Sequence, residues 1–335
     1  QADDQADRPP GLMLVLSRRD LERLLSPADV IRAVEGAFRE HAAGRVQTLP
    51  RAILPMARTA VFLSMVSAVP RRRALGTKLV TVVPQNRRRG LPTIHASYLL
   101  TDPATGAPLC LMEAAFLTAI RTGATSALAA RLLSRRDVST VACFGAGVQA
   151  AFQLRCLQVV RPFERVLFVG RRPERARIFA DRMRETLDLD VQVSWDRQAA
   201  VAGADLITCA TTSATPVFSG RDVRPGTHVD AVGAFRPTSR EVDTTLVKRA
   251  RIVVDTYEGA WEEAGDLLIP LRARAISRRH IRAELAEVVS GRRRGRTSPE
   301  DITLFKSVGW AAEDATTARL AYDRAVAAHV GTRRE

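Results

Sequence analysis

The glycine-rich turn in "STVACFGAGVQAAFQLRCLQVV" constrains the fold more than any other stretch of this sequence. A short apolar run precedes the glycines, and the segment after them has the apolar spacing of a helix. Gly145 permits a tight turn, Gly147 lets a pyrophosphate approach the backbone, and the small Ala150 allows close packing of helix on strand. The pattern predicts a dinucleotide site at the start of a helix, and a glycine turn without a ligand is the alternative.

Strands and helices alternate around this turn, from about residue 134 to residue 299. Apolar runs typical of buried strands are followed by segments whose apolar residues recur at helical spacing. The strand-like runs are STVACF, RVLFVG, VQVSW, ADLITCAT, THVDAVGA and RIVVDT. This alternation predicts an α/β domain of the Rossmann type, in which helices cover both faces of a parallel sheet.

The residues after the second of these strands bear on the choice of cofactor. A carboxylate at this position accepts hydrogen bonds from the ribose of NAD, whereas a guanidinium can bind the 2′-phosphate of NADP. The sequence has Gly170, Arg171 and Arg172 here, and the nearest acid is Glu174. On charge we favour NADP(H), with NAD(H) as the second choice; two solvated arginines in an arginine-rich chain are the alternative interpretation.

A different pattern precedes this domain. Residues 27–44 have the spacing of an amphipathic helix that ends at a glycine, and strand-like pieces separated by proline and glycine turns follow. They predict an α+β domain with an antiparallel or mixed sheet. A long helix rich in small residues, EAAFLTAIRTGATSALAARLL, then bridges into the parallel-sheet domain. Residues 1–11 are polar and rich in proline at their end, which predicts a disordered leader.

Lys78 poses a chemical question, because it lies in the stretch GTKLVTVV, which has the pattern of a buried strand. A buried ammonium group is costly unless an anion meets it. Two partners are consistent with the residues: the carboxylate of a bound substrate, or a structural acid such as Glu113. The residues alone do not choose between them.

Composition narrows the classes of function. The 335 residues carry a formal net charge of +15, but the arginine clusters lie apart and aromatic residues make up only 5%, so nucleic-acid binding is disfavoured. Charge or proline interrupts every apolar run before the roughly 18 residues of a membrane span, which disfavours a membrane protein. The four cysteines have no metal-ligand spacing, so we expect reduced thiols, no metal site and a cytoplasmic location.

Longer motifs resemble the ornithine cyclodeaminase/mu-crystallin family of nicotinamide-dependent enzymes. They are LGTKLVTVVPQN, GLPTIHASYLLTDPATGAPLCLMEAAFLTAIRTGATSALAARLL, GAGVQA, DAVGAFRPTSREVD and LFKSVGWAAEDATTARLAYDRA. The similarity extends over nearly the whole chain after residue 12. Within the family, TKLV, VGAxRPxxRE and FKSxGxAxED are most similar to the mu-crystallin and ketimine reductase branch.

The resemblance implies two domains with separate roles. Residues 12–125 together with 308–335 would form a substrate-binding domain that carries the interface of a homodimer. Residues 126–307 would form the Rossmann dinucleotide-binding domain, and the active site would lie in the cleft between the two.

The resemblance also implies roles for single residues. Arg51, Lys78 and Arg121 match positions that surround the substrate carboxylate, and three clustered cations are tolerable when an anion joins them. Besides Gly145 and Gly147, cofactor contacts are implied for Thr93, Arg121, Val148, Gln149, Arg171, Arg172, Thr211, Val232 and Ser307.

One position departs from the cyclodeaminases of the family. They carry an aspartate two residues after the glycine of the VG element, where it handles water attack and proton transfer, but this chain has Phe235 there. Their glutamate ahead of the active-site lysine has no counterpart in TAVFLSMVSA. A phenyl ring can neither activate water nor take a proton, so loss of ammonia is disfavoured. Asp230 is a candidate substitute for the missing acid, although strand alternation predicts that it points away.

The remaining residues are suited to hydride transfer to a C=N bond. We predict NAD(P)H-dependent reduction of a cyclic or linear ketimine, an α-imino acid, to an amino acid, with Lys78 or solvent giving the proton to the imine nitrogen. Phe235 would form an apolar wall against the substrate or pack under the cofactor. The alternatives are a cyclodeaminase, an oxidative dehydrogenase of N-substituted amino acids, and a mu-crystallin-like protein that binds NADPH and a small aromatic ligand through Phe235 and Glu258.

Overall fold

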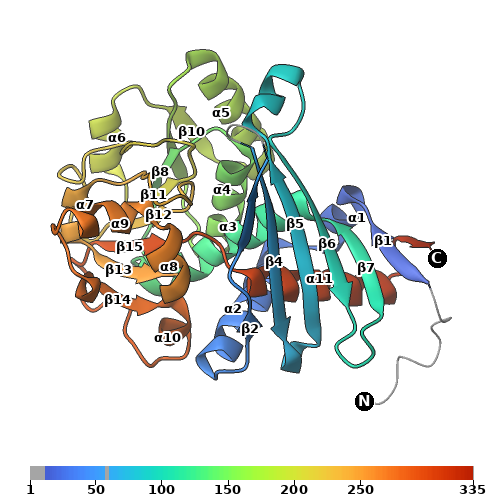
Figure 1. Ribbon diagram of the computed structural model, residues 1–335. Coiled ribbons are helices and arrows are strands. Elements are labelled where there is room, and N and C mark those ends of the chain that lie inside the picture. Colours follow the sequence, from blue (N-terminus) through green and yellow to red (C-terminus); the bar gives the residue numbers. More distant parts are fainter. Residues whose placement is uncertain (1–11, 57–59, 335) are drawn as a thin grey trace. The chain divides into compact units, whose positions relative to one another are not determined.

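The computed structural model describes residues 12–56 and 60–334, which form two compact units (Figure 1). Unit 1 comprises Gln1–Arg121 and Ala311–Glu335, and unit 2 comprises Thr122–Trp310. The predicted leader, residues 1–11, lies outside the described residues. None of the helices in the described part of the chain has both the length and the apolar character that crossing a bilayer requires.

Unit 1 is built on a mixed sheet with the strand order β16-β1-β7-β6-β5-β4-β2, and β3 pairs with β4 beside this path. The strands are β1 Met13–Leu16, β2 Gln47–Thr48, β3 Ala52–Pro55, β4 Val61–Val69, β5 Ala74–Val82, β6 Ile94–Thr101, β7 Pro108–Glu113 and β16 Thr332–Arg334. The pair β1–β7 is parallel and the other pairs are antiparallel. The C-terminal segment thus joins a sheet made by the first third of the chain.

Helices of unit 1 pack on one face of this sheet. They are α1 Arg18–Leu24, α2 Pro27–Ala42 and α11 Ala311–Ala327, with the short 3-10 turns η1 Pro70–Arg72 and η2 Pro84–Arg89 between strands. Helix α11 lies against β4, β5 and α2. Alternate residues of β5, including Lys78, are buried, and Lys78 is 1% exposed. The predicted burial of Lys78 is therefore correct, and its strand lies under α11.

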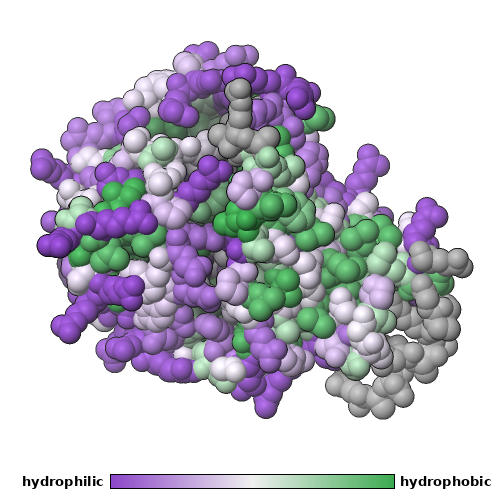
Figure 2. Space-filling model, in the orientation of Figure 1, coloured by the Kyte–Doolittle hydropathy of each residue, from purple (hydrophilic) through white to green (hydrophobic). Residues whose placement is uncertain are grey.

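Apolar side chains are exposed on the strands of unit 1. Ile53, Leu54, Leu79, Ile94 and Leu99 are each more than a third exposed, and Leu79 is the immediate neighbour of the buried Lys78. Successive strand residues point to opposite faces, and the strand register places Leu54, Leu79 and Leu99 on the face opposite Lys78, where they mark an open apolar surface. Figure 2 shows apolar residues gathered over these strands.

Helix α3, Ala114–Leu133, passes from unit 1 into unit 2, as the sequence predicts for a bridging helix. Glu113 ends β7, and its two carboxylate oxygens accept the backbone N–H groups of Ala115 and Phe116 at 2.9 and 3.0 Å. Glu113 therefore caps the start of this helix, where unpaired N–H groups favour a negative charge. The hypothesis that Glu113 is the partner of Lys78 is not supported, because its carboxylate is used in this cap.

Unit 2 contains an eight-stranded sheet in the order β10-β9-β8-β11-β12-β15-β13-β14, with every pair parallel. The strands are β8 Thr140–Phe144, β9 Arg165–Val169, β10 Asp190–Val193, β11 Leu206–Cys209, β12 His228–Ala231, β13 Arg251–Val254, β14 Ile281–Glu284 and β15 Thr303–Lys306. The strand-like runs named in the sequence analysis do not include β15, which lies between β12 and β13 and falls inside the predicted range 126–307. A four-residue strand that contains a lysine gives little periodic signal.

Helices cover both faces of the unit 2 sheet. They are α4 Val148–Val160, α5 Pro173–Leu187, α6 Arg197–Gly203, α7 Thr244–Arg249, α8 Tyr257–Glu263, α9 Gly265–Arg272 and α10 Leu285–Val289, with the 3-10 turn η3 Arg278–His280. Val141 and Cys143 of β8 belong to a buried cluster with α4 and α5, whereas Ala142 and Phe144 belong to a second cluster with α7, α8 and α9. The predicted α/β class with a Rossmann-type sheet is confirmed.

Candidate functional site

The glycine turn follows β8 at the point where the strand order reverses, since β9 and β10 lie on one side of β8 and β11 on the other. Gly145 has φ +116°, and a Cβ atom there would come within 2.4 Å of the Ala210 carbonyl oxygen. Only glycine adopts this conformation without strain and also fits against the end of β11. Ligands of open α/β sheets bind at such a switch point, outside the carboxyl ends of the strands.

Gly147 is the N-cap of α4, and a Cβ atom on it would meet nothing within 4 Å. Val148, the next residue, is 58% exposed, and the first turn of α4 holds no acidic residue. Ala150 is fully buried in the α4–α5 cluster. An open helix N-terminus without a competing carboxylate fits the pyrophosphate of a dinucleotide, so the residues present fit the predicted cofactor.

The other predicted cofactor residues of unit 2 lie after strands of the same sheet. Arg171 and Arg172 are exposed after β9, and Arg172 is the N-cap of α5. Thr211 follows β11 and Val232 follows β12. Ser307 follows β15, but it is 2% exposed and its hydroxyl donates to Asp255 at 2.7 Å.

Lys78 lies in a buried cluster of unit 1 that also contains Arg121, Glu313 and Asp314. The Nζ atom of Lys78 is 2.6 Å from Oδ2 of Asp314. The other oxygen of Asp314 accepts from Nε of Arg121 at 2.9 Å, and Nη1 of Arg121 donates to Glu313 at 2.6 Å. All four side chains are at most 5% exposed. Asp314, on the C-terminal helix α11, is thus the partner of Lys78 that the sequence analysis missed.

Burial and the neighbouring charges act on the two cations of this cluster in opposite ways. Burial lowers the pKa of Lys78 from 10.5 to about 7, with Asp314 opposing and the charges of Arg121 and Arg51 assisting. Burial also disfavours the charge on Arg121, but Asp314 and Glu313 outweigh it and raise the pKa of that guanidinium. Lys78 can therefore gain or lose a proton near neutral pH, whereas Arg121 stays charged.

The remaining predicted residues are spread over the two units. Arg51 is half-buried just before β3, and Thr93 is half-buried just before β6, where its carbonyl accepts from Val83. Gln149 is half-buried in the first turn of α4. Glu258 is exposed in the first turn of α8.

Phe235 is half-buried in the segment after β12, and the guanidinium carbon of Arg236 lies 5.9 Å from its ring centroid. Asp230, the suggested substitute for a catalytic acid, is fully buried and lies 3.2 Å from Nε2 of His228. Burial raises the pKa of Asp230, and His228 acts against this. The prediction that Asp230 points away from the site agrees with its burial.

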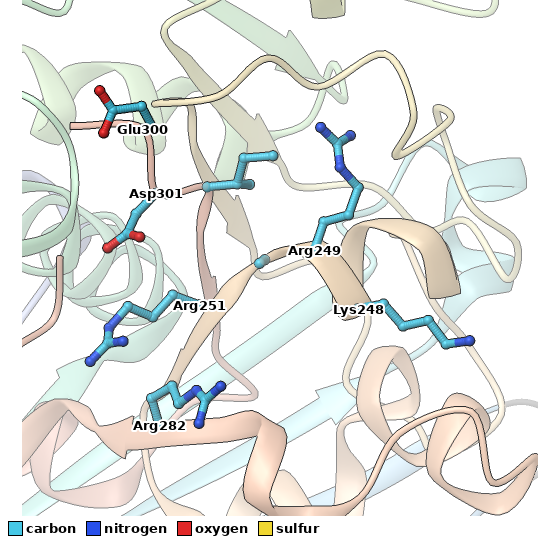
Figure 3. Close-up of a pocket in the computed structure, with 8 residues that line it drawn as sticks. Lys248, Arg249, Arg251, Arg282, Glu300 and Asp301 are labelled. Atoms are coloured by element: carbon cyan, nitrogen blue, oxygen red, sulfur yellow. The ribbon is translucent and has the colours of Figure 1, made fainter. Parts of the chain in front are cut away.

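A pocket with a volume of about 400 Å³ lies on unit 2, away from the residues described above (Figure 3). Its charged lining consists of Lys248, Arg249, Arg251, Arg282, Glu300 and Asp301. It lies where β13 and β15 begin, so it is at the edge of the sheet opposite the glycine turn. The side chains of Lys248 and Arg249 point away from Arg251 in this view, and Arg251 donates to the carbonyls of Gly295 and Arg294. These cations do not converge on one ligand.

The sequence reasoning missed a group of buried charges besides Asp314. They are Glu241, Asp255, Asp266, Lys306 and Glu313, each at most 1% exposed. Glu241, Lys306 and Glu313 do lie inside the motifs DAVGAFRPTSREVD and LFKSVGWAAEDATTARLAYDRA. Their place inside these motifs was the available signal, although the sequence does not show which of the charged residues there are buried.

Comparison with known proteins agrees with these features. The model of the ornithine cyclodeaminase/mu-crystallin family matches residues 13–329. The chain belongs to this family.

Relatives of this chain match it over nearly its full length. A Delta(1)-pyrroline-2-carboxylate reductase of Bacillus cereus is 38% identical and covers 96% of this chain and 100% of its own. The structure of Thermococcus litoralis Delta(1)-pyrroline-2-carboxylate reductase in complex with NADH and L-proline is 43% identical, with a TM-score of 0.93 over 96% of this chain and 99% of that chain. An archaeal alanine dehydrogenase dimer with bound NAD is 33% identical, with a TM-score of 0.91 over 97% and 99%. The predicted family resemblance is confirmed.

Replacing Lys78 by methionine should change how the free energy of unfolding depends on pH. The folded pKa of Lys78 is about 7 and the unfolded value 10.5, so between these values the unfolded chain holds a proton that the folded protein has lost. Wild-type stability relative to Lys78→Met therefore rises with pH, by about 2 kcal/mol between about pH 6.5 and 8.5. Urea unfolding at the two pH values measures this difference.

Lys248→Met, at an exposed lysine, is the matched control and should show no such pH dependence. A stability difference between wild type and Lys78→Met that is the same at both pH values would show that Lys78 keeps its proton in the folded protein.

Proposed function

We propose that this protein is a reductase of cyclic α-imino acids of the Δ1-pyrroline-2-carboxylate type, which it converts to proline-like amino acids. The predicted class, an NAD(P)H-dependent oxidoreductase that reduces a ketimine C=N bond, is confirmed by relatives that match the whole chain and are Delta(1)-pyrroline-2-carboxylate reductases. We further propose a cyclic five-membered substrate, a preferred dinucleotide and roles for single residues.

Reduction is favoured over deamination by the burial of the two carboxylates that lie nearest to Phe235 in the sequence. Asp230 is fully buried beside His228. Glu241 is also fully buried, and its oxygens accept the backbone N–H groups of Thr211 and Gly233 at 2.6 Å each. Neither can accept a proton from an attacking water, so the general-base role that deamination needs is not filled from this segment.

The charges of the unit 1 cluster suit one substrate carboxylate. The positive groups here are Arg51, Arg121 and protonated Lys78, and the negative groups are Asp314 and Glu313. The net charge of these side chains is therefore one positive charge when Lys78 holds its proton. A bound carboxylate therefore favours the protonated form of Lys78, since an opposite charge nearby stabilises the ammonium. Binding of the substrate carboxylate would therefore also protonate Lys78, which could then give this proton to the imine nitrogen.

Reduction of the imine then requires a hydride at carbon and a proton at nitrogen. A reduced nicotinamide bound at the glycine turn supplies the hydride. Gly145, Gly147 and the first turn of α4 would hold its pyrophosphate. Arg51 and Arg121 would hold the substrate carboxylate, and Lys78 would give its proton to the imine nitrogen, with Phe235 as an apolar wall against the ring.

Purified protein should oxidise NADPH or NADH, followed as loss of absorbance, when Δ1-pyrroline-2-carboxylate is added. Ornithine or lysine with the oxidised cofactor should release no ammonia. Phe235→Asp should lower kcat/KM for the imine about tenfold or more, because one well-placed apolar contact contributes about 1–3 kcal/mol to specificity.

Release of ammonia from ornithine by the wild type would contradict the proposal and restore the cyclodeaminase alternative. Turnover of linear N-substituted amino acids alone would favour the oxidative dehydrogenase. Tight NADPH binding without turnover of either substrate would favour the binding-protein alternative.

We infer that the protein prefers NADPH to NADH. Support comes from Arg171 and Arg172, which are exposed in the turn after β9, where the nearest acid in the sequence is Glu174. Arg171→Glu should weaken NADPH binding about 10- to 100-fold and leave NADH binding within a few fold, because charge-assisted hydrogen bonds contribute about 1.5–3 kcal/mol. Fluorescence titration measures both affinities.

Arg175→Glu, also exposed and on α5, is the control for a general effect of charge. Equal affinities of the wild type for the two dinucleotides, unchanged in Arg171→Glu, would overturn the preference. The solved relatives hold NADH and NAD, so NAD(H) is the alternative that this titration decides.

We also infer that the protein is a homodimer. Support comes from the exposed apolar side chains on the unit 1 strands and from the dimeric alanine dehydrogenase relative. Leu99→Glu should convert the dimer to a monomer in light scattering coupled to gel filtration, because a carboxylate cannot be buried unpaired in an interface. Ile178→Glu, at an exposed apolar residue of α5, should not. A wild-type monomer, or a dimer unaffected by Leu99→Glu, would contradict this inference.

A further inference from the structure

A single carboxylate joins the ends of two neighbouring strands in unit 2. Oε1 of Glu241 accepts the backbone N–H of Thr211 at 2.6 Å, in the segment after β11. Oε2 accepts the N–H groups of Gly233 at 2.6 Å and Ala234 at 3.2 Å, in the segment after β12. Three backbone donors at the carboxyl edge of the sheet therefore depend on one side chain, which is fully buried.

The backbone around Glu241 is packed too closely to adjust. A Cβ atom on Gly233 would lie 2.3 Å from the carbonyl oxygen of Thr211 and 2.5 Å from Oε1 of Glu241. Glycine at this position lets the two strand ends come together with the carboxylate beside them. Any loss of the carboxylate would therefore leave tightly packed N–H groups without their acceptor.

Two further buried charges hold Glu241 and its neighbours. Oδ1 of Asp266 accepts the backbone N–H groups of Glu241 at 2.7 Å and Val242 at 3.0 Å. Nζ of Lys306 lies 2.8 Å from Oδ2 of Asp266 and also donates to the carbonyl of Ala234. Lys306 ends β15, so this strand is tied to the same segment.

This network links the glycine turn to Phe235. Gly145 packs against the carbonyl of Ala210, and Thr211 follows at once along the chain. Glu241 holds Thr211 on one side and Gly233 and Ala234 on the other, and Phe235 is the next residue. The position of Phe235 relative to the turn is therefore set largely by one carboxylate.

We propose that Glu241 is a positioning residue of the dinucleotide site: by binding the strand ends of β11 and β12 together, it sets where Thr211, Val232 and Phe235 stand beside the bound cofactor. This inference rests on the proposed function, because it presumes that the glycine turn binds a dinucleotide. Glu241 touches neither cofactor nor substrate in this account, and it acts only through the backbone that it holds.

The charge of Glu241, and not only its shape, is needed for this role. A carboxylate accepts hydrogen bonds on both oxygens, whereas the amide of glutamine accepts on one side and donates on the other. In Glu241→Gln, either Thr211 or the Gly233–Ala234 pair would face another donor. Glu241→Asp keeps the charge but is one methylene shorter, so it can reach one strand end and not both.

The test measures binding of NADPH and NADH to the full-length protein by fluorescence titration, together with thermal unfolding, for wild type and Glu241→Gln. Asp205→Asn is the matched control. Asp205 accepts the backbone N–H groups of Ser139 and Thr140 at 3.1 Å, but at the opposite, amino-terminal edge of the same sheet. Glu241→Gln should weaken the preferred dinucleotide about tenfold or more, in line with the loss of a charge-assisted hydrogen bond. Asp205→Asn should lower the unfolding temperature and leave the affinity unchanged.

Wild-type affinity in Glu241→Gln, whatever its unfolding temperature, would overturn the inference, and so would an equal loss of affinity in Asp205→Asn. If Glu241→Gln does not fold, Glu241→Asp decides: weakened binding supports the positioning role, and wild-type affinity overturns it. Failure of the wild type to bind either dinucleotide would instead overturn the proposed function itself, so the two failures are distinguishable.

Discussion

The ion pair between Lys78 and Asp314 is the interaction on which unit 1 depends. It joins a central strand to the C-terminal helix, 236 residues further along the chain, and through Arg121 it also reaches the helix that leads into unit 2. A lone ammonium in this position would be very costly, and the carboxylate that α11 supplies offsets part of that cost when Lys78 holds its proton. The same arrangement leaves Lys78 with a pKa of about 7, which suits the proton-donor role that we propose for it.

Unit 2 also contains buried charged side chains, and these bind backbone groups at the ends of its strands. Glu241, Asp255 and Asp266 accept backbone N–H groups from the segments that follow β11, β12, β13 and β15. Loop backbone near a ligand must have its polar groups satisfied even where no neighbouring strand is available to pair with it. Carboxylates placed behind these segments meet that need and hold the carboxyl edge of the sheet rigid. In the role that we propose for Glu241, one buried acid would serve both stability and the dinucleotide site.

The sequence predicted those features whose signals are local. The glycine turn could be recognised because its three small residues and the flanking strand and helix all lie within residues 140–160. The burial of Lys78 followed from its apolar neighbours. The partner of Lys78 could not be predicted, because pairing across 236 residues leaves no periodic or spacing signal. The strand β15 was missed since TLFK is short and ends in a lysine, and that lysine is buried only because Asp266 meets it. The hydrogen-bonding role of Glu241 depends on the pairing of β11 with β12, which brings Thr211, 30 residues away, to its carboxylate.

The most direct test of the central claim counts the protons taken up when an anion enters the Lys78 cluster. Isothermal titration calorimetry with pyrrole-2-carboxylate, a flat ring that bears the carboxylate but no reducible C=N bond, would be run at about pH 8 in two buffers of different ionisation enthalpy. We expect the wild type to take up more than half a proton per site, because the carboxylate raises the pKa of Lys78 from about 7. Lys78→Met should take up none. Tight binding without proton uptake by the wild type would contradict the claim that Lys78 is loaded with its proton by the substrate carboxylate.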